Sequence, residues 1–236
     1  MESWKDEAPE GRVQRMKVLI FGATGMVGQG VLHECLRDAD VEQVAAIGRS
    51  ATGIRHARFT EIVHADLASY ASVEDRLRGF DACFFCLGVS SAGMKERDYE
   101  RVTYGFTMAA AETLSRLNPG MSFVFVSGAG TDSTEKGRVM WARVKGRTEN
   151  ALLRLPLNAW MFRPGIIQPL DGIRSKTAAY RLLYGLMRPL LPLLRRAMPN
   201  QIVTTREIGR AMLNVARRGY PKHILETRDL RIAAAS

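Results

Sequence analysis

The sequence predicts an α/β protein built on a doubly wound, mostly parallel sheet of about seven strands, with helices on both faces. Three observations carry this prediction. Short apolar runs alternate with helical patterns, and some runs are apolar at nearly every position, as in 123–126 (Phe-Val-Phe-Val). The first run also leads through closely spaced glycines into an amphipathic stretch. Strands that are apolar on both sides are typical of a parallel sheet covered by helices.

The individual elements follow in chain order. Strands are expected at 16–21, 42–47, 60–64, 81–86, 121–127, 157–163 and 222–226. Helical patterns lie between them at 26–37, 71–78, 95–117, 138–154 and 206–217. Right-handed crossovers between these elements predict the strand order 3-2-1-4-5-6, with the seventh strand added at the end.

Length and composition indicate one soluble globular domain. The chain has 236 residues, of which 46% are hydrophobic and 25% charged, and it holds neither an internal repeat nor a Gly/Ser-rich linker. We expect a flexible, charged extension at 1–15 and a single domain at 16–236. Because the extension lacks the apolar core of a secretory signal and no run is long enough to span a membrane, the predicted location is the cytoplasm.

The stretch 166–205 departs from the alternating rhythm because it contains five prolines close to or within it and a Leu-rich basic segment at 174–196. Leu182, Leu183, Leu186 and Met187 fall on one helical face. Three interpretations stay open: a lid over the substrate side, a helix in peripheral contact with a membrane surface, and ordinary packing against the sheet edge.

Cysteines and histidines predict no metal site. Cys83 and Cys86 are three residues apart on an expected strand and would point to opposite faces, so buried thiols are expected, as for Cys35. The four histidines are scattered without the spacing of metal ligands. Buried thiols agree with a reducing compartment.

Charge is distributed unevenly along the chain. Residues 1–120 carry 14 Lys and Arg against 17 Asp and Glu, whereas residues 121–236 carry 20 against 7. The basic half suggests an anionic partner, such as a phosphate-bearing cofactor, or else a solvated basic face. A nucleic-acid module is not expected, because aromatic residues do not interleave with the basic ones.

The glycine-rich turn after the first strand predicts a dinucleotide site. Gly22 permits a sharp exit from the strand, Gly25 leaves room for a pyrophosphate, and Gly28 lets the following helix lie close to the sheet. The free N–H groups of the helix N-terminus would face the phosphates. Six residues of this turn are candidate cofactor ligands: Gly22, Thr24, Gly25, Met26, Val27 and Gly28.

The end of the second strand indicates which cofactor is preferred. An enzyme that uses NAD usually places Asp or Glu there for the ribose hydroxyls, but this chain has Arg49, with Arg55 nearby. A guanidinium pairs with a 2′-phosphate, which a carboxylate would repel. We therefore expect NADP(H) as the preferred cofactor and NAD as the alternative.

Ligands of open parallel sheets bind beyond the carboxyl ends of the strands, so the remaining strand ends supply further candidates. Asp66 follows the third strand and is expected near the adenine, together with Leu67. The fourth strand leads into Leu87 and Gly88, and the sixth into Pro164 and Gly165, which we also assign to the cofactor site.

Ser127 after the fifth strand and Lys145 on the next helix resemble residues of the short-chain dehydrogenases/reductases. The resemblance covers about residues 16–230 and is greatest to the atypical, Tat-interacting-protein-like branch related to the epimerase/dehydratase group. In that family a Ser orients the substrate oxygen, a Tyr transfers the proton, and a Lys four residues later holds the ribose and lowers the tyrosine pKa. The resemblance implies a Rossmann-like fold and assigns Ser127 and Lys145 to catalysis, with Lys145 also binding the cofactor.

Trp141 occupies the position of the family's tyrosine. An indole N–H donates a hydrogen bond but does not titrate usefully. Either Tyr99, Tyr104, a water or Lys145 supplies the proton, or the chain binds a dinucleotide without turnover as a regulatory or interaction protein, or Trp141 lines an apolar substrate pocket. The leading hypothesis is an NADP(H)-dependent oxidoreductase of the atypical short-chain type, with an unidentified small carbonyl or hydroxyl compound as its partner.

Overall fold

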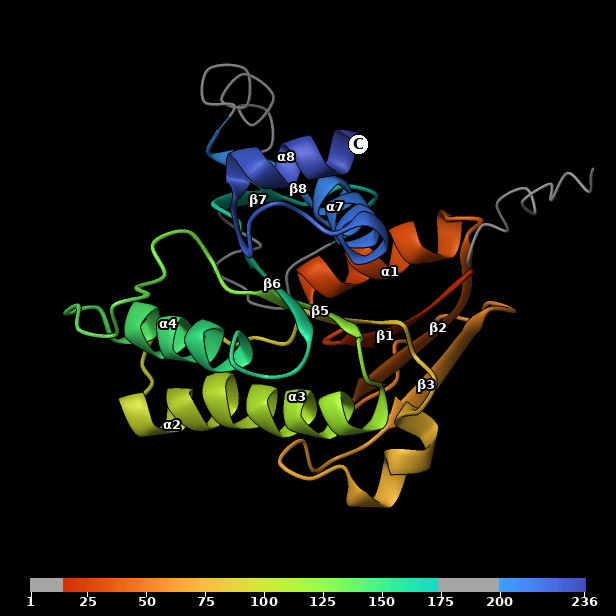
Figure 1. The fold of residues 1–236 in the computed structure, drawn as a ribbon, viewed down its shortest axis with the longest axis horizontal. Helices are drawn as coiled ribbons and strands as arrows, with labels where there is room; N and C mark the ends of the chain where they lie inside the picture. Colours follow the sequence, from red (N-terminus) through yellow and green to blue (C-terminus); the bar gives the residue numbers. More distant parts are fainter. Residues whose placement is uncertain (1–14, 174–199) are drawn as a thin grey trace, which may run out of the picture.

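The computed structural model describes residues 15–173 and 200–236 (Figure 1). Its centre is a seven-stranded sheet in the order β3-β2-β1-β4-β5-β6-β9, in which all neighbouring strands are parallel. The strands are β1 (Met16–Phe21), β2 (Val41–Gly48), β3 (Phe59–Val63), β4 (Ala82–Phe85), β5 (Ser122–Val126), β6 (Asn158–Arg163) and β9 (Ile224–Glu226). The predicted fold class and strand order are confirmed.

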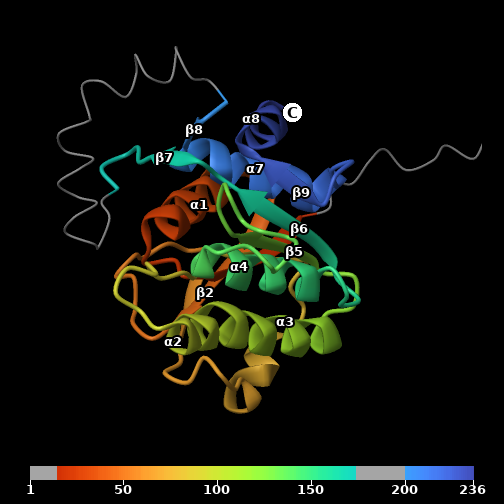
Figure 2. The same cartoon turned by 90° about the vertical axis from the view of Figure 1, so that its left-hand side faces the viewer.

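Helices cover both faces of this sheet, as Figures 1 and 2 show from two directions. One face carries α1 (Met26–Arg37), α7 (Thr205–Arg218) and α8 (Thr227–Ala235). The other carries α2 (Glu96–Glu100), α3 (Phe106–Leu117) and α4 (Met140–Leu152). The doubly wound arrangement follows from strands that are apolar on both sides.

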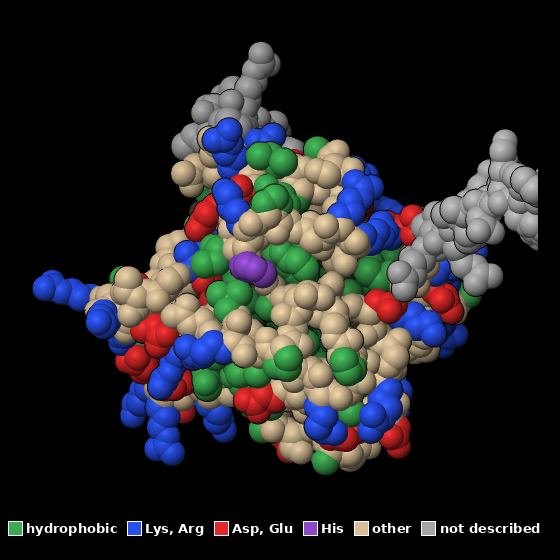
Figure 3. Space-filling model, in the orientation of Figure 1, with side chains coloured by type: hydrophobic (Ala, Val, Ile, Leu, Met, Phe, Trp, Pro, Cys, Tyr) green, Lys and Arg blue, Asp and Glu red, His purple; other side chains and the backbone are tan. Residues whose placement is uncertain are grey.

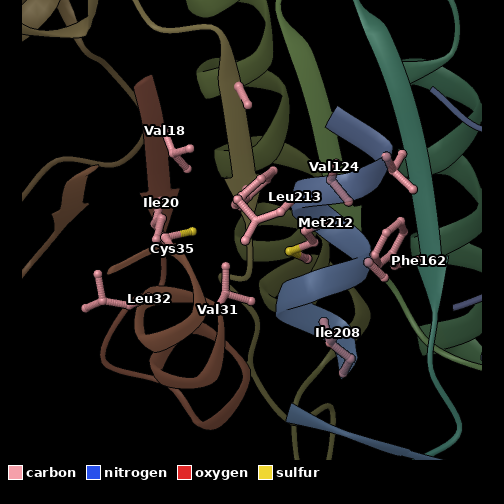
Figure 4. Close-up of a cluster of buried hydrophobic side chains, with 14 of the residues drawn as sticks. Val18, Ile20, Val31, Leu32, Cys35, Val124, Phe162, Ile208, Met212 and Leu213 are labelled. Atoms are coloured by element: carbon pink, nitrogen blue, oxygen red, sulfur yellow. The ribbon is translucent and has the colours of Figure 1, made fainter. Parts of the chain in front are cut away.

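Alternate side chains of the strands feed two separate cores. Val18 and Ile20 of β1 belong to the core under α1 and α7, which Figure 4 shows in close-up. Leu19 and Phe21 of the same strand belong to the core under α3 and α4. All four side chains are at most 1% exposed, and each such burial contributes about 1.5–3 kcal/mol to stability. These cores hold the strand ends in fixed relative positions.

Several elements differ from the sequence prediction. The stretch at 71–78 is a 3₁₀ helix, η1 (Ala71–Leu77), and the predicted helix 95–117 is divided by a π-helical turn, η2 (Arg101–Gly105), between α2 and α3. Not predicted were α8 and a separate parallel pair of short strands, β7 (Ile166–Gln168) and β8 (Ile202–Thr204). The remaining boundaries agree to within two residues.

A reciprocal capping box begins α8. The Glu226 side chain accepts a hydrogen bond from the backbone of Asp229, and the Asp229 carboxylate accepts one from the Glu226 backbone. Such a box satisfies two N–H groups that have no partner within the helix. The spacing of the two acids was therefore a signal for this helix.

Ion pairs join the acidic N-terminal half to the basic C-terminal half. Figure 3 shows acidic and basic side chains mixed over the part of the surface formed by α2 and α4. Among the pairs that connect the halves are Arg217 to Asp38 (2.6 Å), Arg210 to Glu34 (3.0 Å), Arg143 to Glu96 (2.8 Å) and Arg147 to Glu100 (2.5 Å). Part of the charge asymmetry is thus compensated within the molecule.

Two expectations lie wholly or mainly outside the described residues. The N-terminal extension at 1–15 is described only at Arg15, and most of the Leu-rich segment at 174–196 falls in the gap between 173 and 200. The assignment of the stretch 166–205, which contains this segment, as a lid or substrate-side insertion stays a prediction. Within 15–173 and 200–236, no helix has both the length and the apolar character needed to cross a membrane.

Candidate cofactor and active site

The turn between β1 and α1 forms a compact backbone loop at the carboxyl edge of the sheet. Gly25 N–H donates to the Gly22 carbonyl at 2.9 Å, and Gln29 N–H donates to the Gly25 carbonyl at 2.9 Å. Gly22 has a φ of +78°, and a Cβ there would lie 2.7 Å from Leu87 N. A Cβ on Gly28 would lie 2.1 Å from the Gly22 carbonyl oxygen. Glycine is therefore required at both positions by the protein itself.

Gly25 has a different role in the loop. A Cβ there would approach only the Gly22 carbonyl oxygen, at 3.3 Å, so the protein alone does not forbid a side chain. Gly25 also caps α1, and no side chain hydrogen-bonds to the cap. The first N–H groups of α1 are left for an anion. This cradle fits the pyrophosphate of a dinucleotide.

A cavity of about 120 Å³ opens beside this loop, where β1, β2 and β3 end. It is lined by loop residues Gly22 and Thr24, by Arg49 after β2, and by Leu67 and Leu87 after β3 and β4. Five predicted cofactor residues thus meet at one cavity. Its wall also contains residues that we did not predict, namely Ser50, Thr52 and Glu61.

Other predicted cofactor residues lie around the cavity without lining it. The Asp66 carboxylate accepts a hydrogen bond from Ala68 N–H at 2.9 Å and shapes the turn after β3. Met26 and Val27 form the first turn of α1, and Gly88 is exposed just beyond Leu87. Their assignment to the cofactor stays a prediction.

Hydrogen bonds of their backbone atoms hold Pro164 and Gly165 at the end of β6. Ala129 N–H donates to the Pro164 carbonyl at 2.9 Å, and Gly165 N–H donates to Thr227 Oγ1 at 2.8 Å. A Cβ on Gly165 would lie 2.6 Å from the Gln201 carbonyl oxygen. Close packing accounts for this glycine, and its predicted contact with the cofactor is additional.

Ser127 directly follows β5, and its hydroxyl is held by protein groups. The hydroxyl donates to Glu149 Oε1 at 2.5 Å and also lies 3.1 Å from the Phe162 carbonyl oxygen. Glu149, on α4, is 0% exposed. A buried carboxylate needs strong partners, and Ser127 is one of them.

Arg163 is the second partner of Glu149. Its Nε lies 3.0 Å from Glu149 Oε1, and its Nη2 donates to the other carboxylate oxygen. Arg163 Nη2 also donates to Ser133 Oγ at 2.5 Å, in the exposed loop between β5 and α4. This buried pair therefore connects the ends of β5 and β6 with α4 and the loop. Sequence reasoning missed both Glu149 and Arg163.

Lys145 and Trp141 lie one and two helical turns before Glu149 on α4. Lys145 Nζ donates to the Ser127 backbone carbonyl. Burial lowers the pKa of Lys145 to about 8, although the nearby Glu149 carboxylate acts in the opposite direction. The Trp141 ring is half-buried, and its Cη2 would lie 3.6 Å from a Cβ on Gly130. The predicted Ser127, Trp141 and Lys145 thus gather on one side of the sheet edge.

The two tyrosines considered as proton donors have structural contacts. Tyr99 is 2% exposed, and burial raises its pKa. Tyr104 is half-buried, and the Arg147 guanidinium lies 5.4 Å from the centre of its ring. A buried tyrosine with a raised pKa is a poor proton donor near neutral pH.

Cysteine chemistry and metal binding receive no support in the described parts of the chain. Cys35 and Cys83 are buried free thiols, and Cys86 is half-buried. Burial raises the pKa of all three thiols, which disfavours the reactive thiolate. Among residues 15–173 and 200–236, no group of three or more His, Cys, Asp and Glu side chains is placed to hold a metal ion.

Residues 22–179 match the model of a protein family described as NAD(P)H-binding. Protein HTATIP2 of Rattus norvegicus is 24% identical over 160 residues, which cover 66% of this chain and 64% of that protein. The chain therefore matches less than two thirds of the length of this relative. Both findings agree with the resemblance predicted from the sequence.

Solved structures with a similar fold include an epimerase, an enzyme in complex with NAD+ and an oxidoreductase. A UDP-N-acetylglucosamine 4-epimerase from Methanobrevibacter ruminantium M1 has a TM-score of 0.67 at 16% identity. The match covers 90% of this chain and 76% of the epimerase chain. WbmF of Bordetella bronchiseptica, solved in complex with NAD+, has a TM-score of 0.65 at 12% identity and corresponding coverages of 94% and 78%. An oxidoreductase of the short-chain dehydrogenase/reductase family from Burkholderia thailandensis scores 0.63 at 17% identity and covers 93% of each chain. These similarities establish the Rossmann-like fold.

Proposed function

This chain belongs to the NAD(P)H-binding family, and we propose that it is an NADP(H)-dependent oxidoreductase of the atypical short-chain type. Its substrate would be a small carbonyl or hydroxyl compound. The observation that carries the proposal is the position of Lys145, whose ammonium lies at the Ser127 carbonyl beyond the end of β5. In this fold, that edge of the sheet is where ligands bind.

NADP(H) is proposed as the preferred cofactor because of Arg49. This residue is exposed after β2 and lines the cavity next to the glycine loop. A guanidinium at this position offers charge-assisted hydrogen bonds to a 2′-phosphate. The pyrophosphate would lie on the N-terminus of α1, and Leu67 and Leu87 would face the apolar part of the adenosine.

The proposed chemistry requires a proton as well as a hydride. When bound, a nicotinamide cofactor supplies or accepts the hydride. Trp141 has no titratable proton near neutral pH, whereas Lys145 has a pKa of about 8. We therefore assign proton exchange to the Lys145 ammonium, directly or through a water, in addition to a contact with the ribose. Trp141 would form an apolar wall of the substrate pocket.

Ser127 is proposed to belong to the same site. Its backbone carbonyl accepts a hydrogen bond from Lys145 Nζ, and its hydroxyl donates one to Glu149. For the hydroxyl to orient a substrate oxygen, as the family resemblance implies, it would have to exchange one of its present partners for the substrate.

Binding and turnover test the proposal separately. Calorimetric titration of the wild type with NADPH and NADH should show binding of both and tighter binding of NADPH. A panel of activated carbonyl compounds should then be reduced with oxidation of NADPH, and Lys145→Ala should abolish this reaction. Failure to bind either dinucleotide would refute the proposal.

The alternative is a dinucleotide-binding regulatory protein that does not turn over, which the presence of Trp141 favours. Trp141→Tyr places a phenol one helical turn from Lys145. In a protein inactive only because it lacks a proton donor, this substitution should create activity toward the carbonyl panel. If the wild type turns over rapidly and Trp141→Tyr abolishes activity, the indole itself is needed in the substrate pocket.

A further inference from the structure

Glu61 is an acidic side chain in the wall of the proposed cofactor cavity. It lies in the middle of β3, in register with Ala46 of β2, and both residues line the cavity. The end of β2, where the acid of an NAD-binding protein is usual, instead carries Arg49. Glu61 therefore brings a carboxylate from the neighbouring strand to the cavity that Arg49 also lines.

The Glu61 carboxylate binds the loop that carries Arg49. Its Oε1 accepts a hydrogen bond from Thr52 N–H at 2.6 Å. Thr52 also lines the cavity, and its hydroxyl accepts a hydrogen bond from Ile54 N–H at 3.1 Å. A single carboxylate thus holds the first half of the loop between β2 and β3.

Apolar contact on the same side of the sheet supports this closure. Ile54 is half-buried and packs against the core under α1, to which Ala46 and Phe59 also belong. Residues 51–56 have no regular secondary structure, so no strand ladder holds them. Two contacts anchor residues 51–56 beside Arg49 and Ser50: the packing of Ile54 and the bond from Thr52 to Glu61.

We propose that Glu61 is a positioning residue for cofactor selection: by binding Thr52 N–H it holds the loop so that Arg49 faces the 2′-phosphate of NADP(H). This inference rests on the proposed function. The positioning role belongs to the acceptor oxygen of Glu61, whereas its negative charge opposes a phosphate in this cavity. Glutamine offers the same acceptor without the charge.

The test compares Glu61→Ala with Glu61→Gln. Calorimetry gives the dissociation constants for NADPH and NADH, and hydrogen exchange of the cofactor-free protein reports the protection of residues 50–54. In Glu61→Ala the released loop should lose the charge-assisted bond from Arg49 to the 2′-phosphate, which weakens NADPH binding about tenfold. NADH binding should change less than about twofold, and amide exchange in the loop should accelerate. Glu61→Gln keeps the acceptor and removes the charge, so its loop exchange should match that of the wild type and its NADPH binding should be at least as tight.

A double-mutant cycle shows whether Glu61 acts through Arg49. In an Arg49→Ala background, Glu61→Ala should cause no further loss of NADPH affinity relative to NADH. Thr60→Ala serves as the neighbouring control, because Thr60 is exposed on β3 and does not line the cavity.

Three results would overturn the inference. Equal weakening of NADPH and NADH by Glu61→Ala would show a general structural role. An equal loss of NADPH affinity in Glu61→Gln and Glu61→Ala would show that the acceptor oxygen of Glu61 is unimportant. Unchanged exchange at residues 50–54 in Glu61→Ala would show that Glu61 does not hold the loop. A wild type that binds neither dinucleotide would instead refute the proposed function, and the inference with it.

Discussion

Removal of the Glu149 side chain should destabilise the protein more than removal of any exposed acid. Glu149→Ala leaves the Arg163 guanidinium without its main partner in a buried position, where Arg163 is 9% exposed. Breaking a buried pair from one side typically costs about 3–5 kcal/mol. Because Arg163 keeps its bond to Ser133 and lies 3.5 Å from Glu226, we expect the lower end of this range, about 3 kcal/mol.

Chemical denaturation measures the free energy of unfolding, and two further variants provide the comparison. Glu96→Ala breaks the exposed pair with Arg143, in which the Glu96 side chain is 49% exposed, and should cost at most about 1 kcal/mol. The double variant Glu149→Met/Arg163→Met replaces both charges by apolar groups and should recover most of the lost stability. A Glu149→Ala variant no less stable than Glu96→Ala would refute the description of this pair as a buried structural unit.

Three further predictions concern the cofactor loop, Arg49 and Lys145. Gly28→Ala should lower the thermal midpoint of unfolding because its Cβ would clash with the Gly22 carbonyl. Gly25→Ala should keep the wild-type thermal midpoint and weaken NADPH binding in calorimetry. Equal changes of the thermal midpoint in the two variants would contradict this. Arg49→Asp should weaken NADPH binding by roughly 2–4 kcal/mol with little effect on NADH, and an equal loss for both would exclude a 2′-phosphate contact. Since burial lowers the Lys145 pKa to about 8 from 10.5, the unfolded chain binds more protons between these values, so the free energy of unfolding should rise from pH 8 to 10.5 relative to Lys145→Met. A constant difference between the two proteins over this range would mean that the Lys145 pKa is not lowered.

The sheet and much of the glycine loop were predictable because short stretches of sequence determine their structure. A buried parallel strand is a short apolar run, and Gly28 is required by a contact only six residues away, with the Gly22 carbonyl oxygen. The short strands β7 and β8 were not predictable on this basis. Each has only three residues, and they pair with each other across more than thirty positions.

The partners of the candidate catalytic residues were less accessible to sequence reasoning. A glutamate on a helix is usually solvated, and nothing local shows that Glu149 is buried against Ser127 and Arg163. One signal was nevertheless present: Trp141, Lys145 and Glu149 recur every fourth residue and therefore share a face of α4. If that face meets the site through Trp141 and Lys145, Glu149 must approach it as well.

The same reasoning explains why Arg49 was visible in the sequence and Glu61 was not. Arg49 follows directly from its place at the end of a predicted strand, whereas the role of Glu61 depends on the register of β2 with β3 and on the path of the intervening loop. Neither register nor loop path is encoded within a short window. Arg49 alone is therefore insufficient to predict cofactor choice, because Glu61 on the adjacent strand adds an opposite charge to the same cavity. The selectivity of this site should be sought in the pair Arg49 and Glu61, and the double-mutant cycle between them measures it directly.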